Sequence, residues 1–152
     1  MTKLTALIHT CNDGPRLGRA LESLRPCDEL LIFDRNSSDS TARVAREYGA
    51  RVLPAASAAL SQAKHDWILC LLPTEALSEA LEASLFEWKL QGHETSLGFS
   101  MNVREQAGSD WLSHPPTTRL LNRAGRNWAG VLPPEDSQAQ LLEGDLLRFR
   151  EP

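Results

Sequence analysis

The stretch E-L-L-I-F-D-R-N-S-S-D-S-T at residues 29–41 decides the fold. Four apolar residues, 30–33, precede Asp34, and a polar turn then leads to Asp39 and the expected start of a helix. A short continuous apolar run is typical of a buried strand. A carboxylate at the carboxyl end of a buried parallel strand lies where open α/β sheets bind ligands. We therefore predict an α/β sheet with a ligand site at Asp34.

Strands and helices alternate around this stretch. Residues 4–8 and 67–72 are apolar runs that indicate buried strands, and residues 51–53 add a short one. Between the first two predicted strands, apolar residues recur at helical spacing from Leu17 to Leu24, and Asp13 is a candidate helix cap. Residues 55–63 are mostly small, and we expect a closely packed helix there.

The second half of the chain has a different pattern. Residues 97–103 alternate apolar with small or polar side chains, which indicates a half-buried antiparallel strand. Residues 117–131 suggest a β-hairpin with its turn at Ala124-Gly125. For residues 141–150 both a last helix turn and a strand remain open. The whole order predicts one domain over residues 1–152, a three-layer α/β fold with a mixed sheet flanked by helices.

Composition and charge argue against a nucleic-acid partner and against a membrane-spanning segment. The net charge is −4, with 16 basic and 20 acidic residues, which argues against a nucleic-acid partner. The three cysteines are widely spaced and form no C-x-x-C pair, so we expect reduced thiols and a cytoplasmic protein. The longest apolar run, residues 67–72, is far too short to span a membrane.

Polar residues follow three of the predicted strands. Because the carboxyl ends of parallel strands meet at one edge of a sheet, we expect these residues to converge there. They are His9-Thr10-Cys11-Asn12, then Asp34, then Leu72-Pro73-Thr74-Glu75.

Four segments carry a resemblance to a known family. They are L-I-H-T-C-N at 7–12, L-L-I-F-D-R-N-S-S-D-S-T at 30–41, A-R-E-Y-G-A-R-V at 45–52 and, less closely, T-T-R-L-L-N-R-A-G-R-N-W at 117–128. In this order and spacing the chain resembles family 2 glycosyltransferases of the GT-A fold, nearest the bacterial branch that glycosylates lipopolysaccharide cores. The resemblance implies a nucleotide-diphospho-sugar transferase-like domain, shortened on its C-terminal side relative to the family, and a role with cell-envelope polysaccharide.

The resemblance also implies roles for particular residues. Thr10 and Asn12 would shape the floor of a nucleotide pocket, and Asp34 would bind the base of a UDP-type sugar nucleotide. The family's fourth strand ends in Asp-x-Asp-Glu, whose carboxylates hold the sugar nucleotide and Mg²⁺ or Mn²⁺. In this chain Leu72 and Thr74 stand where the two aspartates belong, and Glu75 alone remains. The metal ligands are thus missing, and we assign no cofactor.

Several of these residues have a simpler alternative role. Asp34 is also suited to an Asx turn, and Asp39 fits a helix cap better than a ligand. Glu135 and Asp136 are candidates for the general base that deprotonates an acceptor hydroxyl, or else part of a capped loop. Three arginines are candidates for binding a diphosphate in place of a metal, or else belong to a solvated face: Arg119, Arg123 and Arg126.

The histidines and tryptophans suggest less. The four histidines share no metal-ligand spacing, and we take them as structural. The tryptophans are expected mostly in the core, with Trp111 or Trp128 as a candidate sugar-stacking platform.

Two functions therefore remain in competition. The first is a glycosyltransferase that binds a nucleotide-sugar and transfers the sugar with inversion, using Glu135 or Asp136 as the base and either arginines or Glu75 with a weakly held cation in place of the lost aspartates. The second is a catalytically inactive relative, a pseudoenzyme, that acts as a nucleotide-binding or protein-partner module.

Overall fold

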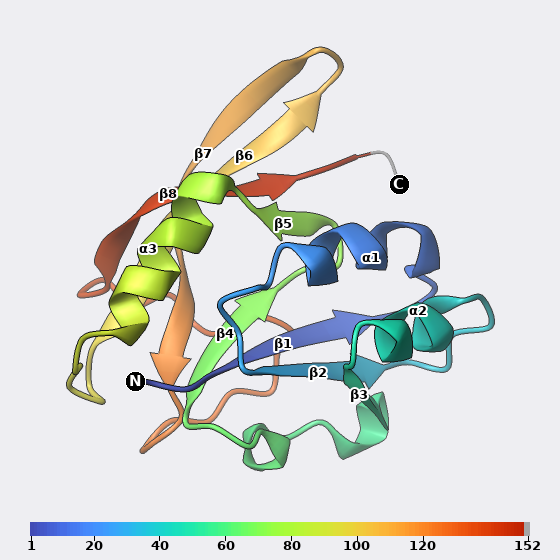
Figure 1. The fold of residues 1–152 in the computed structure, drawn as a ribbon, viewed down its shortest axis with the longest axis horizontal. Coiled ribbons are helices and arrows are strands. Elements are labelled where there is room, and N and C mark those ends of the chain that lie inside the picture. The colour runs from blue at the N-terminus through green and yellow to red at the C-terminus, as the bar shows by residue number, and fades with distance from the viewer. Residues whose placement is uncertain (151–152) are drawn as a thin grey trace.

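The computed structural model describes residues 1–150, and within them the strands form one eight-stranded mixed sheet (Figure 1). The strand order is β3-β2-β1-β4-β7-β6-β8-β5. The strands are β1 (Leu4–Thr10), β2 (Glu29–Asp34), β3 (Arg51–Pro54), β4 (Trp67–Leu71), β5 (Glu75–Leu77), β6 (Gly98–Ala107), β7 (Asp110–Asn122) and β8 (Gln140–Arg148). The helices are α1 (Gly14–Glu22), α2 (Thr41–Glu47) and α3 (Glu79–Lys89), with the 3-10 turns η1 (Ala55–Ser57) and η2 (Leu60–Gln62).

The parallel half of the sheet confirms the strands predicted from the apolar runs. β1 lies between β2 and β4 and runs parallel to both, and β2 also pairs in parallel with β3. Leu31, Ile32 and Phe33 are at most 1% exposed. Parallel strands are covered on both faces, so their side chains are apolar on both. That is why β2 appears as an unbroken apolar run.

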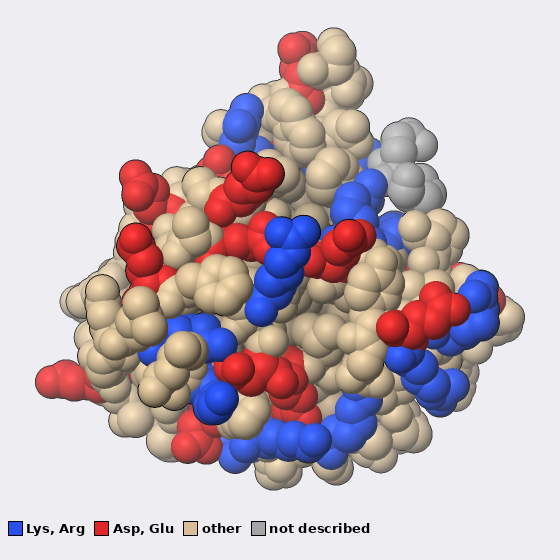
Figure 2. Space-filling view, in the orientation of Figure 1, with Lys and Arg blue, Asp and Glu red and all other residues tan. Residues whose placement is uncertain are grey.

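Helices cover one face of the sheet (Figure 1). Leu17 and Leu21 of α1 and Leu81 and Leu85 of α3 pack in one cluster with the strand residues of this face, including Ile8. The spacing that predicted α1 is therefore its buried stripe. The outer surface of the helices is charged, with acidic side chains gathered over α3 (Figure 2).

The opposite face is covered without an α-helix in the described residues, and the helix predicted over 55–63 is wrong. This segment forms the turns η1 and η2, separated by Ala58 and by Ala59 in extended conformation (φ −159°). Ala59 is exposed and Leu60 is the buried residue of η2. A helix of small residues with no apolar face to bury gains too little from packing to form.

The predicted hairpin over 117–131 is also wrong. β7 begins at Asp110 and pairs antiparallel with β6 across a turn at Gly108. The chain after β7 is an irregular loop over residues 123–139, which packs Trp128 and Leu132 on the second face. Arg126 fixes this loop by donating to the carbonyls of Thr95, Ser96 and Asn122. The loop is therefore held by side-chain hydrogen bonds where we had predicted the second strand of a hairpin.

Two further details refine the second half. Residues 98–101 of β6 are all buried, so this part of the strand is not half-buried as expected. Neighbouring side chains pack closely on it: a Cβ at Gly98 would lie 2.6 Å from Leu121 and 2.9 Å from Asp136. β6 pairs antiparallel with β7 as predicted, but in parallel with β8. Residues 140–148 form a strand, which resolves the alternative left open. No helix within residues 1–150 has the length and apolarity needed to cross a bilayer.

Candidate nucleotide-binding edge

The carboxyl ends of β1, β2 and β4 meet at one edge of the sheet, as predicted. Thr10, the last residue of β1, pairs with Asp34 of β2, and Ile8 of β1 pairs with Leu71 of β4. The turn of residues 72–74, which we call the β4–β5 turn, therefore lies beside the end of β1. The same edge carries Thr10, Asn12, Asp34 and Ser37, which we call the tip cluster.

Asp34 is the centre of the tip cluster. Its Oδ1 accepts hydrogen bonds from the hydroxyls of Thr10 and Ser37, both at 2.6 Å, and its Oδ2 accepts from the Ser37 backbone N–H at 3.0 Å. Burial raises the pKa of Asp34, but the donated hydrogen bonds outweigh burial and hold the pKa below its ordinary value. The carboxylate is thus ionised and fixed at the strand end. The bond to Ser37 N is the expected Asx-type turn.

Asn12 joins the loops that follow β1 and β2. It adopts positive φ (55°), its backbone N–H donates to Ser37 Oγ at 2.8 Å, and its Oδ1 accepts from Ser38 N at 2.8 Å. These bonds make Asn12 a brace between the loops. The brace holds Thr10 and Asp34 in register at the edge.

Asp39 acts as the helix cap that the sequence favours. Its carboxylate accepts from Thr41 N at 2.9 Å, at the start of α2, and from Gly14 N at 3.1 Å, at the start of α1. Asp13 precedes α1 but makes no side-chain cap and accepts from Cys11 N instead. One carboxylate therefore serves two helix N-termini, where negative charge is favoured.

Two neighbouring cavities lie at this edge, and Thr10 of the tip cluster lines one of them. One of about 250 Å³ is lined by Thr10, Cys11, Asp13 and Arg35 among others, and one of about 210 Å³ by Leu60 and Trp128 among others. Both share three lining residues, His9, Phe33 and Ala55. Aromatic walls with a few polar groups are typical of small-molecule sites.

The ring of His9 lies between these cavities. Its centroid is 5.3 Å from that of Phe33. Burial, and then the charge of Arg35, lower the pKa of His9 below its ordinary value, so the imidazole is neutral at pH 7. The sequence placed His9 at the strand end expected to carry a ligand site, but we took its side chain as structural.

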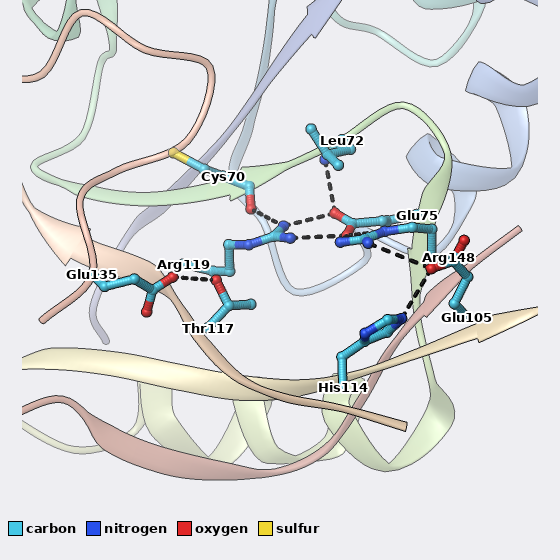
Figure 3. Close-up of polar contacts among 9 residues, drawn as sticks. All are labelled: Cys70, Leu72, Glu75, Glu105, His114, Thr117, Arg119, Glu135 and Arg148. Atoms are coloured by element: carbon cyan, nitrogen blue, oxygen red, sulfur yellow. Dashed lines mark hydrogen bonds and ion pairs between the residues drawn. The ribbon is translucent and has the colours of Figure 1, made fainter. Parts of the chain in front are cut away.

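The β4–β5 turn has a different chemistry (Figure 3). Glu75 is 0% exposed, and Arg119 binds it in bidentate fashion at 2.6 and 2.9 Å. Arg148 donates to the same carboxylate at 3.0 and 3.2 Å, and Leu72 N donates at 2.9 Å. Burial raises the pKa of Glu75, but the hydrogen bonds and charge of Arg119 outweigh it and hold the pKa below its ordinary value. Glu75 is therefore an anchor for the turn.

These residues do not fit the divalent cation that the resemblance implies. Leu72 offers no ligand atom, Thr74 offers a neutral hydroxyl, and both oxygens of Glu75 face guanidinium groups. Mg²⁺ and Mn²⁺ require several oxygen ligands, usually with carboxylate charge. Across residues 1–150 no group of three or more His, Cys, Asp or Glu side chains is placed to hold a metal. The expectation that Glu75 could bind a cation weakly does not fit this geometry.

The three candidate phosphate-binding arginines do not gather at this edge. Arg119 is 1% exposed and also donates to the Cys70 carbonyl, so it cannot reach a bound phosphate. Arg123 pairs with Asp66, which precedes β4, and donates to the carbonyls of Leu60 and Ala63. Arg123 and Arg126 line a cavity of about 620 Å³ at the opposite end of β4. Their positions correct the expectation of a shared diphosphate site.

Glu135 and Asp136 lie in the loop after β7. Glu135 accepts hydrogen bonds from Thr117 Oγ1 at 2.6 Å and from the backbone N–H of Thr118 at 2.9 Å (Figure 3). Burial raises its pKa, and these bonds outweigh burial and lower it. Asp136 accepts from Gln138 N at 2.9 Å. Both line a cavity of about 420 Å³ together with Trp128. Their hydrogen bonds fit the capped-loop interpretation, and their position at the cavity fits the interpretation as a site.

Comparisons with known proteins agree with this architecture. The chain is 34% identical over 148 residues to an uncharacterized glycosyltransferase of Rickettsia felis, covering 87% of this chain and 52% of the relative. It is 32% identical over 148 residues to the uncharacterized glycosyltransferase RP128 of Rickettsia prowazekii, covering 87% and 50%. The chain thus spans about half the length of the curated relatives it matches. It matches no protein-family model.

Solved structures show the same fold. The S. aureus protein TarS 1-349 in complex with UDP superposes with a TM-score of 0.52 at 15% identity, over 72% of this chain and 37% of that one. Glucosyl-3-phosphoglycerate synthase from Mycobacterium tuberculosis, with Mn²⁺, UDP and phosphoglyceric acid, gives 0.50 at 17% identity, over 70% and 44%. The predicted α/β class and the GT-A-type glycosyltransferase fold are confirmed.

Proposed function

We propose that this chain is a family 2 glycosyltransferase-like domain that binds a nucleoside-diphosphate sugar of the UDP type at the tip cluster. The observation that carries the proposal is the fixed, ionised carboxylate of Asp34 at a strand end, bound to Thr10, which lines one of two neighbouring cavities. Ligands of open α/β sheets bind at this edge. The similarity to glycosyltransferases along 87% of the chain supports the same ligand class.

The residues divide the work of binding between them. Asp34 uses its oxygens on Thr10 and Ser37, and a carboxylate has further acceptor positions for the N–H of a base or a ribose hydroxyl. Phe33 and His9 supply flat surfaces against which a base packs. Thr10 and Asn12 keep the edge in shape. The pocket is therefore built before the ligand arrives.

Sugar transfer to a hydroxyl acceptor requires a base, and Glu135 or Asp136 is our candidate for a single displacement with inversion. Both line the cavity that contains Trp128, which supplies a surface for a sugar ring. The lowered pKa of Glu135 keeps it deprotonated, and hence able to accept a proton, at neutral pH. The acceptor we propose belongs to cell-envelope polysaccharide, as in the lipopolysaccharide-core branch, with the reaction in the cytoplasm.

The second candidate is a catalytically silent relative that binds the nucleotide or a protein partner. Leu72, Thr74 and the paired state of Glu75 favour it, because charge stabilisation by a metal is worth several kcal/mol in such reactions. Activity assays separate the two candidates. Turnover of a UDP-sugar supports transfer, and tight binding without turnover supports the silent relative.

Isothermal titration calorimetry of the chain with UDP tests the proposal. We expect saturable binding, and we expect Asp34→Ala to weaken it by about tenfold or more, the loss of a hydrogen bond to a charged group. Asp110→Ala, at the exposed end of β7, removes the same group far from the edge and is the matched control. Failure of UDP to bind at about 1 mM, near 4 kcal/mol of affinity, would contradict the proposal.

A further inference from the structure

Two guanidinium groups bind the carboxylate that anchors the β4–β5 turn. Glu75 contributes one negative charge, and Arg119 and Arg148 both bind it. Farther out, Glu105 pairs with Arg150 at 3.3 Å, contacts Arg148 at 3.8 Å and bonds to His114. Glu135 adds a third carboxylate charge on the side of Arg119. A further cation is disfavoured next to the guanidinium groups that bind Glu75.

Arg148 is the member of this network that reaches the surface. Its side chain is 28% exposed, whereas that of Arg119 is 1% exposed. Its Nε and one terminal nitrogen bind Glu75, but its other terminal nitrogen lies 3.8 Å from Glu105, beyond hydrogen-bond distance. That nitrogen has donors available for a ligand. The Glu75 carboxylate meanwhile fixes the direction of the guanidinium.

Arg148 also lies next to the β4–β5 turn. It pairs with Glu75 across β5 and β8, and the backbone N–H of the next residue, Phe149, donates to the Thr74 carbonyl at 2.9 Å. The β4–β5 turn follows Leu71, which pairs with Ile8 only two residues before Thr10. The β4–β5 turn therefore lies next to the strand end that carries Thr10 of the tip cluster.

We propose that Arg148 binds the diphosphate of the nucleotide at the β4–β5 turn, in place of a divalent cation. This inference rests on the proposed nucleotide site. Guanidinium groups bind phosphate oxygens with paired, charge-assisted hydrogen bonds. Arg148 is 28% exposed and supplies a positive charge at the turn, as a metal would. The lost aspartates and the buried ion pair are then two parts of one arrangement for metal-independent binding.

The test compares uridine with UDP in calorimetric titrations of the full chain, with EDTA and then with Mn²⁺. We expect UDP to bind more tightly than uridine, with affinities that differ by less than about twofold between EDTA and Mn²⁺. Arg148→Gln should weaken UDP by about tenfold and leave uridine unchanged. Arg148→Lys should retain part of the difference because it keeps the charge.

Arg150→Gln is the matched control, since it removes one charge from the same network without touching Glu75. Circular dichroism and the thermal midpoint verify that each variant is folded, which is expected because Arg119 still binds Glu75 in Arg148→Gln. If uridine and UDP both bind but Arg148→Gln leaves their ratio unchanged, the role of Arg148 is refuted and the nucleotide site stands. If neither ligand binds, the proposed function itself fails.

Discussion

Two neighbouring carboxylates at the same edge of the sheet show how partners decide what a residue does. Asp34 is held by hydroxyl and backbone donors and is partly exposed, and its partner Thr10 lines a cavity. Glu75 is completely buried and held by two guanidinium groups and a backbone N–H. The first arrangement leaves acceptor positions open to a ligand. The second fills them and makes the carboxylate part of the protein's framework.

The comparison also accounts for the residues at the β4–β5 turn. With Glu75 bound to Arg119 and Arg148, the turn keeps its shape without a metal, so Leu72 and Thr74 need not be ligands. A metal site that had simply lost two aspartates would leave Glu75 reaching into the cleft. The structure instead shows a turn closed from beneath by an ion pair (Figure 3).

The strongest way to break the comparison is to remove the partner of Glu75. Arg119→Met leaves a buried carboxylate with one guanidinium fewer, and we expect it to lower the free energy of unfolding by about 3–5 kcal/mol, measured by urea denaturation. Arg43→Met removes an exposed pair with Glu47 and should cost less than about 1 kcal/mol. The double variant Arg119→Met/Glu75→Leu should recover part of the loss, because no buried unpaired charge remains and the partly exposed Arg148 still lies 3.8 Å from Glu105. Equal, small effects for Arg119→Met and Arg43→Met would show that Glu75 is not an anchor.

A second test crowds the start of α1, which follows Asn12 of the tip cluster and donates to Asp39. A Cβ at Gly14 would lie 2.4 Å from Ser40 Oγ and 3.1 Å from Asp39 Oδ2, so Gly14→Ala should cost about 1–3 kcal/mol of unfolding free energy and weaken UDP binding. Gly18 lies in the same helix, and a Cβ there would meet nothing closer than 3.5 Å from Tyr48. Gly18→Ala should therefore be neutral or stabilising by about 0.5–1 kcal/mol. Chemical denaturation of both variants distinguishes crowding at the cluster from a general effect of alanine in α1.

Lowering the pH should have a smaller effect on stability than the substitutions above. Asp34 and Glu75 both have a lowered pKa in the folded protein, so each contributes stability above the ordinary carboxyl pKa that is lost as the pH falls through the folded value. Thermal midpoints should hence decline below about pH 4. Asp34→Asn should flatten this decline only slightly, because its side chain is partly exposed to solvent. A midpoint that rises on acidification would contradict the assigned directions.

Much of the fold was predictable from the sequence, and the reason is local. β2 is covered on both faces, so its sequence is one apolar run that ends at Asp34. Residues 55–63 were mispredicted because their small side chains carry no pattern, and their conformation depends on contacts made elsewhere. The loop over 123–139 is likewise set by the bonds of Arg126 to distant carbonyls.

The same difference between local patterns and distant contacts applies to the candidate site. Thr10 and Asp34 were predicted because each follows an apolar run at a strand end. Arg148 was missed because it contacts Glu75 across 73 positions in the chain, with no motif near either residue to connect them. The pairing of Glu75 with Arg119 spans 44 positions, and it turns a candidate metal ligand and a candidate phosphate ligand into one ion pair.

The most direct test of the closed β4–β5 turn is the dependence of UDP affinity on Mn²⁺, measured by calorimetry on the unaltered chain. The variant Leu72→Asp/Thr74→Asp, which restores two carboxylates, should gain about tenfold in affinity with Mn²⁺ and serves as the positive control. For the unaltered chain, we expect affinities with Mn²⁺ and with EDTA that agree within about twofold. A tenfold or greater gain with Mn²⁺ in the unaltered chain would show that the turn still holds a cation and would contradict this account.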